Sequence, residues 1–283
     1  MAWSRNDNAL EHLARLGYGA RGFVYCVVGA LALLAALGQG GSAGDSKSAL
    51  RAVLGGPFGV VIVGLIALGL AGFALWRLVE GVTDADRRGR SPKALAVRGA
   101  HLISAVIYAG LSLTAARLAF GIGRASAGGD GVRDWTAWLL DQPLGPWLVG
   151  IVGLGIGGAG FGYAAKAWKG HVTERLSLPA GSERWTCHLG RFGYAARGLV
   201  FLMIGGFVLA AAWTQASSEA TGLSGAFAAL RAQPYGWVLL AIVAAGHFAF
   251  GAFGLIQARY RHIDAPDLGD ADEAVAKAMH PSR

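Results

Sequence analysis

Hydrophobic residues gather into six long runs, and polar residues are largely confined to the segments between them. The runs cover roughly residues 18–38, 57–79, 99–120, 144–165, 192–213 and 235–257. None of these runs contains an Asp or a Glu. Because about 20 apolar residues in a helix cross the ~30 Å hydrocarbon core of a bilayer, the pattern predicts an all-α integral membrane protein with six transmembrane helices.

A short polar and aromatic motif recurs where the odd-numbered runs begin. The stretch RLGYGARGFVY at 15–25 returns as RFGYAARGLVF at 191–201. A third copy starts at Arg98, where His101 replaces the tyrosine and Ser104 replaces the second arginine. The motif therefore marks the start of a repeated unit, and its middle copy has diverged.

A second landmark opens each even-numbered run. It is a P-x-G triplet at 57–59, 143–145 and 234–236, followed twelve residues after each proline by Gly69, Gly155 or Gly246. We expect each proline to occupy the first helical turn, where its fixed φ and missing N–H are tolerated. The repeated unit is thus a helical hairpin used three times. Three hairpins that enter from the same side are parallel, and a pseudo-threefold axis along the membrane normal can relate them.

The repeats divide the chain into five segments. These are an N-terminal segment at 1–14, two-span repeats at 15–90, 91–175 and 176–260, and a polar tail at 261–283. Gly/Ser-rich loops and short mixed segments connect the two spans of each repeat. Trp135 and Trp138 predict that the mixed segment of the middle repeat is a helix at the membrane interface.

Positive charge is distributed unequally between the two sides of the predicted bundle. Nineteen of the 25 Lys and Arg residues lie on the side that holds both termini and the loops after the second and fourth runs. The positive-inside rule therefore predicts cytoplasmic N- and C-termini. The net charge of +8 does not indicate nucleic-acid binding, because the charges border apolar runs in a chain that is 54% hydrophobic and only 15% charged.

The combination of R-x-G-Y-x-A-R-G at the start of one span and P-x-G at the start of the next, three times over about residues 10–260, carries a family resemblance. It resembles the bacterial membrane proteins grouped as domain of unknown function 1206. The resemblance implies a six-span protein of the bacterial cytoplasmic membrane, and it implies no activity and no catalytic residues. Because His101 and Ser104 depart from the motif, we expect any shared site to deviate from threefold symmetry.

The repeated motif supplies candidates for binding an anion. Arg15, Tyr18, Arg21 and Tyr25 fall within an arc of about 120° on one helix face. They are either snorkelling anchors stacked on aromatic rings, or Arg21 and Arg197 converge on an anion such as a lipid headgroup. The candidate anion- or lipid-binding residues are Arg15, Tyr18, Arg21, Arg98, Arg191, Tyr194 and Arg197.

A second set of polar residues lies inside the predicted spans. His101, Ser104, Tyr108 and Ser112 are spaced by three or four residues and form a stripe on the third run. His247 lies near the middle of the sixth run. These residues either form hydrogen bonds between helices or line a permeation or ligand path, since polar groups in a membrane avoid lipid.

Signatures of enzymes, cofactors and metals are missing. GLGIGGAG in the fourth run matches G-x-G-x-x-G, but no strand precedes it, and its glycines suit close helix packing instead. His171, Glu174, Cys187 and His188 have no zinc-type spacing. We therefore expect a non-catalytic protein that binds anionic phospholipid, another membrane protein or a second copy of itself. The alternative is a passive channel or facilitator for a small solute or ion, lined by the third and sixth spans.

Overall fold

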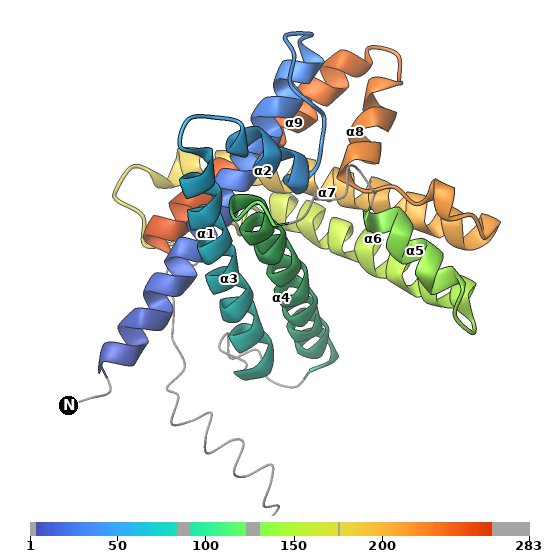
Figure 1. Ribbon diagram of the computed structural model, residues 1–283. Helices are drawn as coiled ribbons and strands as arrows, with labels where there is room; N and C mark the ends of the chain where they lie inside the picture. Colours follow the sequence, from blue (N-terminus) through green and yellow to red (C-terminus); the bar gives the residue numbers. More distant parts are fainter. Residues whose placement is uncertain (1–3, 84–90, 123–130, 175, 262–283) are drawn as a thin grey trace, which may run out of the picture.

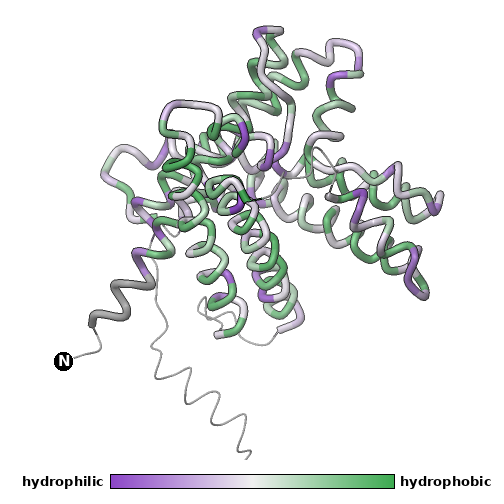
Figure 2. Tube along the Cα trace, viewed as in Figure 1, coloured by the Kyte–Doolittle hydropathy of each residue, from purple (hydrophilic) through white to green (hydrophobic). Residues whose placement is uncertain are grey.

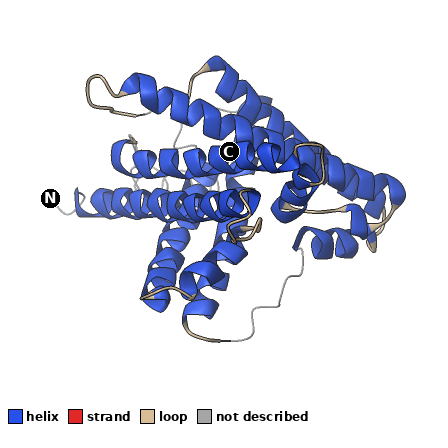
Figure 3. Cartoon of the chain, turned by 90° about the horizontal axis from the view of Figure 1, so that it is seen from above, coloured by secondary structure: helices blue, strands red, loops and turns tan. Residues whose placement is uncertain are grey.

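The computed structural model describes residues 4–83, 91–122, 131–174 and 176–261. Within these ranges the chain is helical, with loops and no strand (Figure 3). The six long helices are α1 (Ser4–Ala36), α3 (Gly59–Thr83), α4 (Pro92–Ala119), α6 (Gly145–Lys169), α7 (Glu183–Thr214) and α9 (Gly236–Tyr260). The short ones are α2 (Ser46–Leu54), α5 (Gly131–Leu140), α8 (Leu223–Arg231) and the 3₁₀ turn η1 (Ser217–Glu219).

The six long helices confirm the predicted membrane architecture. Each is long and apolar enough to cross a membrane, and hydrophobic positions recur along the coloured parts of these helices (Figure 2). The short mixed segments between spans form α2, α5 and α8, so the segment with Trp135 and Trp138 is helical as expected. The polar tail beyond residue 261 and the loop around Arg88, both predicted to be cytoplasmic, lie outside the described residues.

The three repeats are joined cyclically by their helix pairs. The second long helix of each repeat packs along the first long helix of the next: α3 on α4, α6 on α7, and α9 on α1. Figure 1 shows these pairs as three arms that diverge from a common centre. This cyclic order confirms a bundle built from three related hairpins.

Small residues allow the paired helices to approach closely. A Cβ atom added at Gly29 of α1 would collide with the backbone nitrogen of Phe248 in α9, and one at Gly205 of α7 would lie 2.7 Å from the nitrogen of Gly157 in α6. At the same repeat position α4 carries Ser112, whose hydroxyl donates a hydrogen bond to the carbonyl of Ala67 in α3 at 2.7 Å. Backbone contact thus holds two pairs, and an interhelical hydrogen bond holds the third.

The P-x-G triplets form the same turn in all three repeats. The central residues Phe58, Leu144 and Tyr235 have positive φ angles of 57°, 62° and 57°, a strained conformation for side chains of this size. The following glycines are required because a Cβ there would collide with the carbonyl of Leu54, Leu140 or Arg231 at the end of the preceding short helix. The expectation that the prolines lie in the first helical turn was wrong. They precede it, since the long helices begin at the glycines.

The middle hairpin is open, whereas the other two are closed. Helix α1 packs on α3 and α7 packs on α9, but α4 and α6 form no comparable interface in the described part of the chain. In the closed hairpins, a Cβ at Gly17 would lie 2.7 Å from the backbone nitrogen of Phe73, and one at Gly193 would lie 2.6 Å from that of Phe250. The equivalent residue of the middle repeat is Ala100, which carries the Cβ atom that this contact excludes.

Candidate functional site

The first arginine of each repeat binds the end of a neighbouring helix. Carbonyl groups in the last turn of an α-helix lack intrahelical partners and carry partial negative charge, which cations stabilise. The pairs are Arg15 Nη1 with the oxygens of Ala258 (3.3 Å) and Arg259 (2.6 Å), Arg98 Nε with Gly81 (2.9 Å) and Nη2 with Val82 (2.7 Å), and Arg191 Nε with Ala167 (2.9 Å). These three arginines therefore cap α9, α3 and α6 and join consecutive repeats.

The second arginine of the motif is buried in both repeats that have it. Arg21 and Arg197 are each only 8% exposed. The Cζ atom of Arg197 lies 4.7–5.2 Å from the ring centres of Tyr25, Tyr163, Phe201 and Phe250. Aromatic faces are electron-rich and attract a guanidinium group, more strongly when water is excluded. Arg197 thus lies in a cage of four rings that come from four different helices.

Arg21 has a similar environment and shares Phe250 with Arg197. Its Cζ atom is 5.4 Å from the ring centre of Phe250, 4.9 Å from that of Phe73 and 5.3 Å from that of Tyr18. Its Nη2 donates a hydrogen bond to Gln257 Oε1 at 3.0 Å. Phe250 contacts both guanidinium groups, so the two arginines lie close together at the centre of the repeats.

Neither of these arginines is fully hydrogen bonded by the described residues. The Nε atoms of Arg21 and Arg197 are buried without a partner there. Tyr108 of α4 and Tyr163 of α6 both lie close enough to interact electrostatically with the two arginines. All six long helices therefore contribute to this site, which we name the central arginine cluster (Tyr18, Arg21, Tyr25, Phe73, Tyr108, Tyr163, Arg197, Phe201 and Phe250).

A buried carboxylate lies next to the cluster. Glu80 of α3 is 1% exposed. Its oxygens are 2.9 Å from Arg77 Nη1, 3.2 Å from Arg261 Nη2 and 3.7 Å from His101 Nδ1. The expectation that the apolar runs are free of acidic residues is therefore too strict, because α3 continues to Thr83 and includes Glu80. The pattern R-L-V-E at 77–80 would have shown this pair, had the second span been extended by one residue.

Among the described residues, positive charge exceeds negative charge at the centre of the repeats. Arg77 stacks on Phe73 at 4.9 Å, and Arg261 stacks on Tyr18 at 4.7 Å. These two arginines bind Glu80 and, like Arg21 and Arg197, lie over aromatic rings. Their Nε atoms have no partner among the described residues either. Buried charge is costly unless it is compensated, so the arrangement is suited to an anion.

The polar stripe on α4 contacts α3. Tyr108 packs edge-on against Phe73 at 4.7 Å between ring centres, Ser112 bonds to α3, and His101 lies beside Glu80. Ser104 is half-buried. His247 is buried, bonds through Nδ1 to the carbonyl of Val243 at 3.0 Å and packs against Phe227 of α8. The contacts of His101, Tyr108, Ser112 and His247 thus lie within and between helices.

Tyr194, the counterpart of Tyr18, lies at the other side of the site. Its hydroxyl accepts a hydrogen bond from Lys166 Nζ at 3.2 Å, and its ring packs against Phe250 and Phe253. Sequence reasoning placed the tyrosines and arginines of the motif on common helix faces. It missed Tyr163, Gln257 and Arg261, because their contacts form only when distant helices pack together.

Comparison with known proteins places the chain in a family. Residues 16–84, 100–170 and 192–261 each match the family described as Domain of Unknown Function (DUF1206). The uncharacterized protein YxxB of Bacillus subtilis (strain 168) is 31% identical over 257 residues, which cover 90% of this chain and 92% of that protein. No solved structure matches. The family matches three segments of the chain, and the Bacillus relative aligns with most of it. The chain therefore belongs to the DUF1206 family.

Proposed function

We propose that this protein is a non-catalytic protein of the bacterial cytoplasmic membrane that binds the headgroup of an anionic phospholipid through Arg21 and Arg197. The observation that carries the proposal is the pair of buried guanidinium groups whose Nε atoms have no hydrogen-bond partner among the described residues. Ionisable residues inside membrane bundles are costly, and they usually mark a binding or transport site. A phosphate would accept the hydrogen bonds that the described residues leave unmade and would offset the excess positive charge.

The depth of the cluster suits a headgroup. Arg21 and Arg197 each follow a capping arginine by six residues, which is about 9 Å along a helix axis. Long side chains on helices lean toward the N-terminus, and Arg21 indeed reaches Gln257 near the end of α9. The guanidinium groups therefore lie near the level where the capped helices end. The candidate path-lining residues His101, Tyr108, Ser112 and His247 contact their own or neighbouring helices. No observation therefore favours the channel or facilitator as a second candidate function.

Arg21→Lys combined with Arg197→Lys is expected to lower the amount of phosphatidylglycerol or cardiolipin that the purified protein retains, by about tenfold. Lysine keeps the charge, but it lacks the planar fork that binds phosphate through two hydrogen bonds. Native mass spectrometry of the protein in detergent measures the retained lipid.

Ser104→Ala is the matched control, because Ser104 occupies the same repeat position without a charge. It should change lipid retention much less than the double substitution. Equal retention of both anionic lipids by the wild type and the double lysine variant would contradict the proposal and leave these arginines a packing role.

The proposed orientation places both termini and the capping arginines at the cytoplasmic face. It is supported by the charge asymmetry of the chain under the positive-inside rule. Reporter fusions at either terminus, at Arg88 and at Lys169 should all report the cytoplasm. A periplasmic signal from Arg88 or Lys169 would overturn this orientation.

A further inference from the structure

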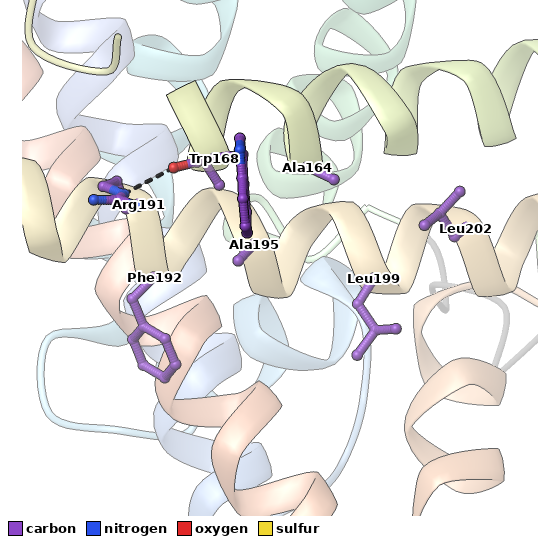
Figure 4. Close-up of a pocket in the computed structure, with 8 residues that line it drawn as sticks. Ala164, Trp168, Arg191, Phe192, Ala195, Leu199 and Leu202 are labelled. Carbon is purple, nitrogen blue, oxygen red and sulfur yellow. Dashed lines mark hydrogen bonds between the residues drawn. The ribbon is translucent and has the colours of Figure 1, made fainter. Parts of the chain in front are cut away.

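An apolar groove runs between α6 and α7 (Figure 4), and none of its lining residues belongs to the central arginine cluster. Its volume is about 500 Å³, within the range of pockets that hold small ligands. The groove exists because small residues occupy both helices where they face it, with Leu199 and Leu202 along one wall. The small residues are Ala164, Ala167 and Ala195. From Arg191 to Leu202 it extends for about 16 Å along α7.

One end of the groove is polar. Arg191 and Trp168 lie there, and Trp168 is 85% exposed. Tryptophan is enriched where hydrocarbon meets the headgroups, and α6 ends one residue later at Lys169. The groove therefore has an apolar part at membrane depth, which we call the trough, and a cationic end at the interface. This arrangement matches a lipid that has an apolar chain and an anionic head.

Arg191 is less occupied than the capping arginines of the other repeats. Arg15 binds Glu11 at 2.9 Å in addition to its two carbonyls. Arg98 uses both Nε and Nη2 for carbonyls. Within the described ranges Arg191 uses only Nε, and Cys187 stands where repeat one has Glu11. Both Nη groups of Arg191 therefore remain free to bind a ligand from outside the described residues.

We infer that this groove is a second lipid site, which takes one acyl chain of an anionic glycerophospholipid between α6 and α7 and its phosphate at Arg191. The charge of Arg191 favours an anionic headgroup, and the exposed apolar walls favour an acyl chain. Free phosphate could bind Arg191, but it would gain no binding energy from the apolar trough. A membrane helix laid along the groove would use the walls but not the charge. The site shares no residue with Arg21 and Arg197 and does not depend on the function proposed for them.

Quenching of Trp168 fluorescence tests this inference. The full-length protein is placed in phosphatidylcholine vesicles that contain increasing fractions of brominated phosphatidylglycerol or brominated phosphatidylcholine. The difference between the wild type and Trp168→Phe isolates the emission of Trp168. Half-quenching of Trp168 should require about fivefold less brominated phosphatidylglycerol than brominated phosphatidylcholine, which is the effect of one basic residue on an anionic lipid.

Two variants separate the contributions of the charge and the trough. Arg191→Gln should bring the two lipids to equal quenching. Ala195→Phe, which fills the trough at an exposed position and keeps Arg191, should reduce quenching by both lipids, and it decides the matter if Arg191→Gln does not fold. Arg21→Lys with Arg197→Lys should leave the fivefold preference intact. Failure of the function proposed for the central arginine cluster can therefore be distinguished from failure of the groove site. Equal quenching by the two lipids in the wild type, a preference that Arg191→Gln leaves unchanged, or quenching that Ala195→Phe leaves unchanged overturns the inference.

Discussion

Replacing Glu80 with alanine is expected to destabilise the protein by about 3–5 kcal/mol. Glu80 is the carboxylate partner of both Arg77 and Arg261 at the centre of the repeats. Removing one partner of a buried ion pair leaves the other charge buried without compensation, which costs more than the pair itself contributes. Glu80→Gln should be milder, because the amide oxygen still accepts one hydrogen bond. The thermal unfolding midpoint in detergent measures both effects.

An exposed ion pair provides the control for Glu80. Glu174 lies 3.5 Å from His171, and its side chain is 66% exposed. Exposed pairs contribute about 0–1 kcal/mol, so Glu174→Ala should shift the midpoint very little. If Glu80→Ala and Glu174→Ala gave the same unfolding midpoint, the buried ion pairs of Glu80 with Arg77 and Arg261 would not contribute to holding the repeats together.

The predictability of this fold depends on the range of the interactions. Helix length and hydropathy are local properties, so the six spans follow from the sequence. The repeats are revealed by the constant offsets of the other motif residues from Arg15, Arg98 and Arg191. The partners of these arginines are not local. Sequence reasoning named them as candidate lipid ligands, and it could not show that each also binds carbonyls at the end of α9, α3 or α6.

The surroundings of Glu80 and Arg197 show the same limit. Glu80 binds Arg77 three residues away but also Arg261, which is 181 residues away. The cage of Arg197 combines rings from four helices, of which only Phe201 is on its own helix. Helical periodicity predicts that Arg21 faces the same way as Tyr18, but it cannot show which rings of other helices close the cage.

The open middle hairpin is a further feature that the repeat alone conceals. Gly69, Gly155 and Gly246 occupy one repeat position and look equivalent in sequence. A Cβ at Gly69 would lie 2.5 Å from the Cβ of Ala20, and one at Gly246 would collide with Ala196, whereas Gly155 has no neighbour within 4 Å. The residue equivalent to Ala20 and Ala196 is Ile103. Its larger side chain opposes closure of the middle hairpin, as does the Cβ of Ala100.

Valine at these three glycines should therefore have unequal effects. Gly69→Val and Gly246→Val force a branched side chain into a packed interface, where overpacking costs about 1–3 kcal/mol or more. Each should lower the thermal unfolding midpoint by about 5 °C or more. Gly155→Val adds its side chain to an open helix face and should leave the midpoint nearly unchanged. The three variants make the same chemical change at the same repeat position, so intrinsic helix propensity cancels from the comparison.

The result for Gly155→Val decides whether the middle hairpin stays open in the membrane. If α4 and α6 closed as the other hairpins do, the new valine would meet Ile103, and the loss of stability would equal or exceed that of Gly69→Val. Such a loss would contradict the open arrangement. A midpoint close to that of the wild type would show that α6 presents this glycine face to lipid, because only an unpacked face accepts the added volume without cost.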